Sequence, residues 1–260
     1  MRKIIHYCWF GKKEIPTYAK QSLESWKKYA KGYELKCWNE ENFDIRKDSF
    51  VEEAYKSGKM AFVSDYVRLW AIYNFGGIYM DLGSELIKDI DDLLKLSNNI
   101  AVFERSSTTV NSGLFIACEK GNPLIKELLH RYDMLKYEDS DSFRMNHTTN
   151  VMLTKLLMEK GLKRIDKTQI LDNWIVLSSE YFNPIYSIGG FHIKKSTYSV
   201  HRYAASWREP KEAYKDSLAY RLSFFIGNRL GNIFARVATE IKFDKNFFDA
   251  LRNVCMKIFL

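Results

Sequence analysis

Between residues 60 and 81, an apolar helix pattern leads through a glycine pair into a short strand that ends in a carboxylate. The apolar side chains recur at steps of three and four residues, which is the spacing of an α-helix. They are Phe62, Val63, Tyr66, Val67, Trp70, Ala71 and Phe75. Gly76 and Gly77 supply a helix stop, and residues 78–81 have the pattern of a strand. Because ligands of α/β sheets bind beyond the carboxyl ends of strands, we expect Asp81 to lie at a ligand site.

The rest of the chain alternates strand and helix patterns. Residues 3–10 predict a buried strand, the apolar period after Pro16 predicts a helix, and residues 33–38 predict a second strand. This order is typical of a parallel sheet. Further strands are predicted at residues 100–104, 113–117, 174–177 and 197–203, and further helices at residues 93–96, 123–132 and 151–158. The sequence therefore predicts an α/β fold.

The length and composition fit one globular domain with an extension. A chain of 260 residues is near the upper end of what one α/β domain occupies. Hydrophobic residues make up 46% and charged residues 28%, which excludes a disordered chain and a polytopic membrane protein. We assign residues 1–210 to the α/β domain and residues 211–260 to a basic, amphipathic, helical C-terminal extension.

Cysteine usage and the N-terminal segment predict a cytoplasmic location. The four cysteines are scattered and lack the spacing of a zinc site. The apolar run at residues 4–10 is followed at once by Lys12 and Lys13, without a cleavage site for an export signal. No stretch reaches the roughly 18 to 20 apolar residues that cross a bilayer. Membrane contact is therefore expected to be peripheral, on the inner face of the membrane.

The charge balance predicts an anionic partner. The formal net charge is +8 and the isoelectric point is about 9.1. A nucleotide diphosphate, an acidic membrane surface and a nucleic acid all meet this requirement. The basic residues are dispersed and no nucleic-acid-binding motif is present, so we expect no nucleic-acid partner.

The C-terminal extension has one apolar face with basic residues interspersed. The apolar positions are Leu222, Phe225, Ile226, Leu230, Ile233, Phe234, Val237 and Ile241, and the basic ones are Arg221, Arg229, Arg236 and Lys242. A basic amphipathic helix can lie on an anionic membrane surface. Such a helix can equally pack on its own domain or on a second subunit. Both interpretations stay open on the sequence alone.

Asp65 and Arg68 are the first polar pair within the apolar helix pattern. They are three residues apart and therefore share one face of the helix. An arginine in this position can hold a diphosphate while the carboxylate binds a sugar or ribose hydroxyl. The alternative is an ordinary structural ion pair.

Four landmarks in order along the chain resemble glycosyltransferase family 32, in its sugar-binding region containing the D-x-D motif. The landmarks are residues 4–11, residues 38–42, residues 62–81 with S-D-Y-V-R and G-G-I-Y-M-D, and residues 201–207 with H-R-Y-A-A-S-W. Relatives in that family include yeast outer-chain mannosyltransferases and bacterial capsule enzymes. The sequence is more distantly similar to the glucosylating toxins of clostridia.

The resemblance implies a GT-A-type fold, a nucleotide-diphospho-sugar donor, a divalent metal and transfer with retention of configuration. By motif match, Trp9 is expected to stack on the donor base, while Asp65 and Arg68 hold the sugar and phosphate of the donor. Asp81 corresponds to the first carboxylate of D-x-D. Asp65 and Asp81 are thus the expected catalytic residues. For Trp9, core packing is the alternative.

Three further segments are implicated by the same resemblance. Asn111, within Asn-Ser-Gly, is expected to contact the donor sugar, and residues 148–150 to lie on the acceptor side. Ordinary turn chemistry is the alternative for both segments. Ser206 and Trp207 resemble the loop that closes over the diphosphate, with core packing as the alternative for the tryptophan.

The D-x-D motif departs from the family pattern at its second aspartate, which is Gly83 here. Glu85 points the same way as Asp81 in an extended chain but is about 13 Å away, too far to share an ion unless the chain turns. Gly83 permits such a turn. We expect Asp81, Glu85 and His201 to bind Mn2+ or Mg2+ on a bent loop. The alternatives are neutralisation of the diphosphate by Arg68 without metal, and loss of turnover.

The sequence therefore predicts a glycosyltransferase that moves a sugar to a hydroxyl of a polysaccharide or lipid-linked glycan, in cell-surface or capsule polysaccharide synthesis. A non-catalytic module that binds sugar nucleotides or glycans is the alternative, motivated by Gly83. A nucleic-acid-binding protein is the third and weakest hypothesis.

Overall fold

The computed structural model describes residues 1–105, 108–183, 193–201 and 210–244. The chain divides into two compact units. The first contains Met1–Asn183 and Lys195–Arg202, and the second contains Pro184–Lys194 and Tyr203–Leu260. The sequence-based boundary between residues 210 and 211 stays a prediction.

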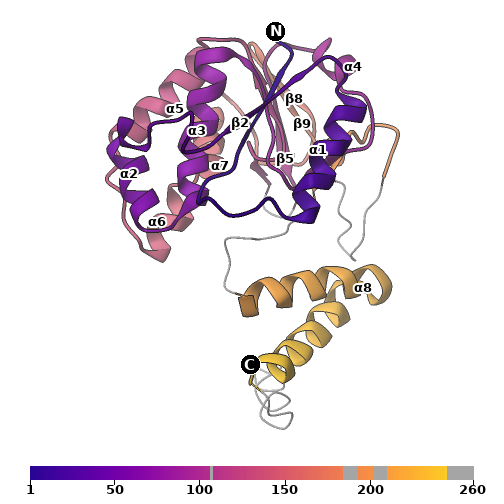
Figure 1. The fold of residues 1–260 in the computed structure, drawn as a ribbon. Coiled ribbons are helices and arrows are strands. Elements are labelled where there is room, and N and C mark those ends of the chain that lie inside the picture. The colour runs from indigo at the N-terminus through magenta and orange to yellow at the C-terminus, as the bar shows by residue number, and fades with distance from the viewer. Residues whose placement is uncertain (106–107, 184–192, 202–209, 245–260) are drawn as a thin grey trace. The chain divides into compact units, whose positions relative to one another are not determined.

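The first unit is built on an eight-stranded mixed sheet with the order β2-β1-β3-β7-β5-β9-β8, and β6 pairs with β5 (Figure 1). The strands are β1 (Ile4–Cys8), β2 (Glu34–Trp38), β3 (Gly77–Tyr79), β5 (Ile100–Glu104), β6 (Thr109–Val110), β7 (Ile116–Cys118), β8 (Gln169–Leu171) and β9 (Trp174–Leu177). The pairings make β1, β2, β3, β5 and β9 run in one direction and β6, β7 and β8 in the other. A separate two-stranded ribbon joins β4 (Ser84–Leu86) to β10 (Ser199–His201).

Helices cover both faces of this sheet. They are α1 (Thr17–Tyr29), α2 (Ser49–Lys56), α3 (Met60–Phe75), α4 (Asp91–Leu94), α5 (Pro123–Asp133), α6 (Asp141–Asn146) and α7 (Thr149–Glu159), with short 3-10 turns at Ile45–Lys47 and Ser179–Tyr181. In Figure 1, α3, α5 and α7 lie on one side of the sheet and α1 lies on the other. The predicted fold class is confirmed: α/β, with a mostly parallel sheet between helices and a helical C-terminal segment.

Each face of the sheet packs into its own hydrophobic cluster. In β1, Ile5 and Tyr7 join the cluster that contains α1, whereas Cys8 joins the cluster that contains α3, α5 and α7. In β5, Ile100 and Ala101 divide in the same way. Successive residues of a strand point to opposite faces, so a strand buried on both sides is apolar along most of its length. In β1 the apolar run is interrupted only by His6.

The glycine pair between α3 and β3 is required by both conformation and space. Gly76 has φ +66° and Gly77 has φ +106°, a region that side chains other than glycine rarely adopt. A Cβ on Gly77 would lie 2.7 Å from the carbonyl oxygen of Ile4, and one on Gly76 would lie 2.7 Å from the backbone nitrogen of Lys120. The pair therefore ends α3 and lets β3 approach β1 closely.

His6, in β1, ties the end of α3 to β2. Its Nε2 lies 2.9 Å from the carbonyl oxygen of Gly76, and its Nδ1 accepts a hydrogen bond of 3.1 Å from Nε1 of Trp38. This arrangement requires a neutral imidazole with its proton on Nε2. Burial lowers the pKa of His6, against the smaller effect of its bond to Gly76.

Two predicted strands have different limits in the structure. The strand expected at residues 113–117 begins at Ile116, because the side chain of Asn111 accepts hydrogen bonds from the backbone N–H groups of Gly113 and Leu114 and holds a turn there. The strand expected at residues 197–203 is β10, and its last two predicted residues lie outside the described part of the chain.

The second unit contains α8 (Pro210–Asp244). Its helical character agrees with the amphipathic pattern in the sequence. Among the described residues, no helix combines the length and apolar character needed to cross a membrane.

Candidate functional site

Asp81 lies just beyond the carboxyl end of β3, as the sequence predicts. Its backbone N–H donates to the carbonyl of Gly113 at 2.7 Å, and the hydroxyl of Tyr79 donates to Asp81 Oδ1 at 2.8 Å. A Cβ on Gly113 would overlap Asp81 Oδ2, so glycine is required there to leave room for the carboxylate. The Asp81 side chain remains 39% exposed. Asp81 is therefore a fixed, partly exposed carboxylate at the carboxyl end of the central strand β3.

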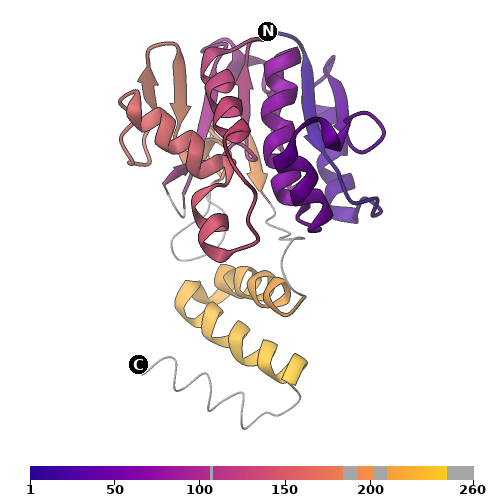
Figure 2. The ribbon, with the colours of Figure 1, turned by 90° about the vertical axis from the view of Figure 1, so that its left-hand side faces the viewer.

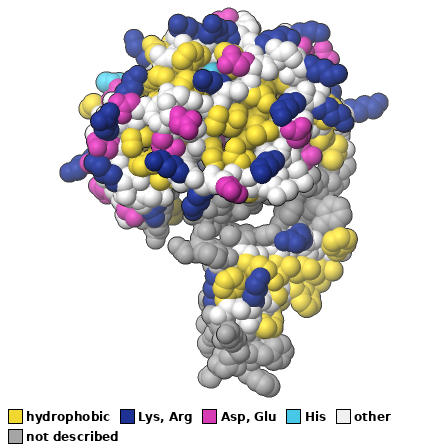
Figure 3. All heavy atoms as spheres, in the orientation of Figure 1, with side chains coloured by type: hydrophobic (Ala, Val, Ile, Leu, Met, Phe, Trp, Pro, Cys, Tyr) yellow, Lys and Arg dark blue, Asp and Glu magenta, His cyan; other side chains and the backbone are white. Residues whose placement is uncertain are grey.

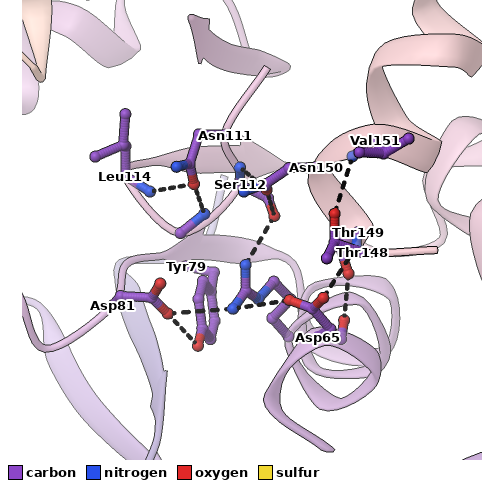
Figure 4. A network of polar contacts seen from close by, with 12 residues as sticks. Asp65, Tyr79, Asp81, Asn111, Ser112, Leu114, Thr148, Thr149, Asn150 and Val151 are labelled. Atoms are coloured by element: carbon purple, nitrogen blue, oxygen red, sulfur yellow. Dashed lines mark hydrogen bonds and ion pairs between the residues drawn. The ribbon is translucent and has the colours of Figure 1, made fainter. Parts of the chain in front are cut away.

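Arg68 connects this carboxylate to α3. Its Nη2 lies 3.1 Å from Asp65 Oδ1 and 3.3 Å from Asp81 Oδ1, and its Nη1 donates to Ser112 Oγ at 3.0 Å (Figure 4). The guanidinium also lies 4.9 Å from the ring centre of Tyr79. The side chain of Arg68 is only 6% exposed. Arg68 is therefore a buried residue that links α3 to Asp81 and orients its carboxylate. Both of its terminal nitrogens interact with side chains of the protein.

The N-terminus of α7 completes the network around Asp65. The backbone N–H of Thr149 donates to Asp65 Oδ2 at 3.0 Å, and its hydroxyl donates to the Asp65 carbonyl at 3.0 Å. Asn150 Oδ1 accepts from both the N–H and the hydroxyl of Ser112, at 2.9 and 3.0 Å. Burial raises the pKa of Asp65, and this effect is opposed by the charge of Arg68 and the bonds from Thr149. The two segments predicted to lie at the site, residues 111–113 and residues 148–150, thus both contact the Asp65–Arg68 pair (Figure 4).

His201 occupies the space beside Gly83. A Cβ on Gly83 would lie 2.7 Å from His201 Nε2 and 2.9 Å from Cε1. The chain turns at this point, as the N–H of Ser84 donates to the carbonyl of Asp81 at 2.9 Å. Burial lowers the pKa of His201, while the negative charges of Asp81 and Glu104 act in the opposite direction. The imidazole therefore lies where a second aspartate of D-x-D would extend its side chain.

The three predicted metal ligands are not gathered as a cluster. The ribbon register pairs His201 with Ser84 and Glu85 with Val200. Since adjacent residues of a strand point to opposite faces, Glu85 lies on the face opposite to His201. The part of the chain that the structure describes has no group of three or more His, Cys, Asp or Glu side chains placed to hold a metal. The set Asp81, Glu85 and His201 stays a prediction.

Trp9 follows β1 directly. Its backbone N–H continues the ladder to the carbonyl of Trp38 at 2.9 Å, and its indole Nε1 donates to the carbonyl of Lys13 at 2.6 Å. The ring is partly buried against the cluster that contains α1. Its stacking role stays a prediction. Ser206 and Trp207 lie outside the described residues.

Two residues of this site were missed in the sequence. Tyr79 is two positions before Asp81, and the alternation of side chains along a strand predicts that both face the same way. Glu104 ends β5 and accepts from Asn111 Nδ2 at 3.3 Å. The rule that ligands bind at the carboxyl ends of strands applies to Glu104 as well as to Asp81, and that signal was available.

Residues 16–102 match the family described as glycosyltransferase sugar-binding region containing DXD motif. The matched span includes Asp65, Arg68, Asp81 and Gly83. The match covers about a third of the chain and shows that this part is similar to the sugar-binding region of that family. At the position of the second motif aspartate this chain has Gly83, which the imidazole of His201 covers.

Other similarities are partial. The chain is 33% identical over 97 residues to an uncharacterized protein of Arabidopsis thaliana, a match that covers 37% of this chain and 13% of that protein. Among solved structures, the PaToxG glycosyltransferase has a TM-score of 0.47 and 17% identity, over 62% of this chain and 69% of that one. A glycosyltransferase involved in glycosylation of the major capsid of PBCV-1 has a TM-score of 0.44 and 14% identity, over 76% and 92% of the two chains.

Proposed function

We propose that this chain transfers a sugar from a nucleotide-diphospho-sugar to a hydroxyl of a polysaccharide or lipid-linked glycan. Asp81 carries the proposal. Its carboxylate lies beyond a strand end, is fixed by Arg68 and Tyr79 through Oδ1, and keeps a partly exposed side chain. A preorganised group of this kind is what a donor sugar or its metal requires, since orientation and charge stabilisation account for most of the rate enhancement in group transfer.

The surrounding residues support donor binding in distinct ways. Asn111 and Ser112 form the turn opposite Asp81, and we assign them to the donor sugar. Trp9, with its edge fixed by the bond to Lys13, is assigned to the nucleotide base. Ser206 and Trp207 are assigned to the diphosphate on motif match alone. Retention of configuration, a role in capsule or cell-surface polysaccharide synthesis, and a cytoplasmic location on the inner face of the membrane belong to the same proposal.

The donor atoms beside Asp81 fit a divalent metal. A carboxylate oxygen and an imidazole nitrogen suit Mn2+, and Mg2+ favours the carboxylate. The lowered pKa of His201 keeps its imidazole neutral near pH 7, which is the form that binds metal. We assign Asp81 and His201 as protein ligands, and Glu85 would join them only if the ribbon changed its register. A bound metal would supply positive charge for the leaving diphosphate.

Donor binding and transfer test the proposal directly. Nucleotide-sugars are screened for their effect on thermal unfolding with and without Mn2+, because a ligand at about 100 times its Kd stabilises the native state by about 2.7 kcal/mol. With the donor so identified, Asp81→Asn should lower turnover by at least about 100-fold. Asp133→Asn, which alters an exposed carboxylate on α5, is the matched control and should keep full activity. Full activity of Asp81→Asn would refute the site.

A non-catalytic sugar-nucleotide-binding module is the second candidate, and Gly83 is the observation that favours it. This alternative predicts donor binding in calorimetry without transfer to any acceptor or to water. Hydrolysis of the donor by the wild-type chain, lost in Asp81→Asn, would exclude it.

A further inference from the structure

Helix α8 folds back on itself. Lys211 Nζ lies 3.0 Å from Glu240 Oε2, and Lys242 Nζ lies 3.9 Å from the ring centre of Tyr214. A straight helix rises about 1.5 Å per residue and would separate Lys211 from Glu240 by roughly 43 Å. Two glycines, Gly227 and Gly231, lie near the midpoint of the segment. Residues 210–244 therefore form a helical hairpin, and Figure 2 shows its two arms side by side.

The hairpin buries small side chains. Ala235 and Thr239 are buried on the second arm, Gly231 is buried at its start, and Ala219 is buried on the first arm. On the second arm the small residues recur every four positions and so form one stripe. Small residues let two helices approach closely. The interior of the hairpin thus consists of small side chains at the described positions.

Large apolar side chains of the hairpin face outward instead. The exposed ones are Phe225 (81%), Ile226 (40%), Leu230 (51%), Phe234 (55%), Ile241 (39%) and Phe243 (39%). Figure 3 shows hydrophobic side chains together with Lys and Arg on the visible face of this unit. Apolar surface of this kind, gathered on one short segment, marks an interaction site in a soluble protein.

The hairpin carries a net positive charge. Residues 210–244 contain six basic and four acidic residues, which gives a net charge of +2. Glu240 is paired with Lys211, and Arg221, Arg236 and Lys242 are exposed. If two copies of the chain met through this face about a two-fold axis, these like charges would be brought together, which opposes association. A partner surface that is apolar and negatively charged complements both the exposed apolar side chains and the basic residues of the hairpin.

We propose that the hairpin of residues 210–244 binds the surface of an anionic lipid bilayer. Phe225, Leu230 and Phe234 enter the boundary between headgroups and acyl chains, and Arg221 and Arg236 contact lipid phosphates. The long stems of the arginines allow their guanidinium groups to remain at headgroup level. This inference rests on the membrane location in the proposed function and names the surface that contacts lipid, and its test does not depend on turnover.

Vesicle sedimentation of the full chain tests the proposal. Binding is expected to vesicles of phosphatidylcholine with 30% phosphatidylglycerol, to be absent with phosphatidylcholine alone, and to weaken as salt increases. Each arginine near the surface contributes about fivefold to the affinity. Arg221→Glu with Arg236→Glu is therefore expected to weaken binding by at least about tenfold. The double variant Phe225→Ser with Phe234→Ser should weaken vesicle binding by a similar factor, because the two phenylalanine rings no longer bury apolar area in the bilayer.

Matched controls distinguish binding through the hairpin from nonspecific effects of net charge and exposed apolar surface. Met134→Ser with Ile170→Ser removes two exposed apolar side chains of the first unit, and Lys126→Glu with Lys155→Glu changes the net charge by the same amount as the arginine pair. Both controls should bind like wild type, and so should Asp81→Asn. Unchanged thermal unfolding of the hairpin variants would establish that they fold.

Three results would overturn the proposal. The first is that the wild-type chain does not bind the anionic vesicles, and the second is that the hairpin variants and their controls lose binding equally. The third is that vesicle binding is absent while light scattering shows a dimer, which Phe225→Ser with Phe234→Ser dissociates. Loss of transfer activity in Asp81→Asn with intact vesicle binding would leave both proposals standing separately.

Discussion

His201 fills the space into which a side chain at position 83 would project. The departure from the D-x-D pattern is thus accompanied by an imidazole in the space that a second carboxylate would take. Gly83 does not have a positive φ, so glycine is required there by lack of room rather than by backbone conformation. Sequence reasoning attributed Gly83 to the turn alone, because the neighbour that excludes a side chain lies more than 100 residues away.

A double-mutant cycle at Gly83 and His201 tests this steric relation. Gly83→Ala is expected to destabilise the fold by about 1 to 3 kcal/mol, as overpacking in well-packed sites does. His201→Ala removes the obstructing ring, so the cost of Gly83→Ala should largely disappear in the double variant. Denaturant titration gives the free energy of unfolding of all four proteins. Additive effects of the two substitutions would contradict the predicted contact.

The buried His6 gives the fold a defined pH dependence. Its ordinary pKa is 6.5, and the folded state lowers it, so the unfolded chain binds the proton more readily. Stability is therefore complete above about pH 6.5 and falls as the pH drops toward the folded-state pKa. We expect the free energy of unfolding to decrease between pH 7.5 and 5.5. His201, whose pKa is also lowered, should add to the decrease.

A matched substitution isolates the contribution of His6. His6→Gln retains hydrogen-bonding groups but cannot titrate, and it should flatten this part of the pH profile whatever its effect at pH 7.5. His130→Gln, which changes an exposed residue, is the control and should leave the profile as in wild type. An unchanged slope in His6→Gln would show that other groups cause the decrease.

At the level of elements, local patterns predicted what lies within one helix or strand. The apolar period predicted α3 at residues 60–75, and the apolar run at residues 4–10, interrupted by His6, predicted β1, because both patterns depend only on neighbouring residues. The contact of α7 with α3 was beyond such reasoning. Thr149 reaches Asp65 across 84 positions, and no periodicity encodes that pairing. The pairing of β10 with β4 is long-range for the same reason.

The junction of α3 and α7 predicts different effects for the two carboxylates of the network. Asp65 is nearly buried, so Asp65→Asn leaves Arg68 and Thr149 with an uncharged partner and should cost about 3 to 5 kcal/mol. Asp81 is partly exposed, and Asp81→Asn should cost less than about 1 kcal/mol. Denaturant titration of both variants measures this difference. Equal costs would mean that Asp65 is not the structural member of the pair.

At the scale of the whole molecule, the two units are expected to respond to different ligands. A bound nucleotide-sugar should slow amide hydrogen exchange in residues 65–81, 111–113 and 149–150, which form the site. Anionic vesicles should slow exchange in residues 210–244 and leave the site unaffected. Mass spectrometry of peptides from the full chain measures both. Donor-induced protection confined to the hairpin would contradict both assignments.

The ribbon of β4 and β10 sets an order of events while the polypeptide is being made. Residues 4–118 include the centre of the sheet and leave the ribosome first, whereas β10 arrives only with residues 199–201. Domains generally fold as units, so a domain is complete only when its last segment has been synthesised. A nascent chain that ends before β10 therefore has its motif aspartate but lacks the imidazole that covers Gly83. The surroundings of Gly83 can therefore be completed only after residues 199–201 have been synthesised, late in translation.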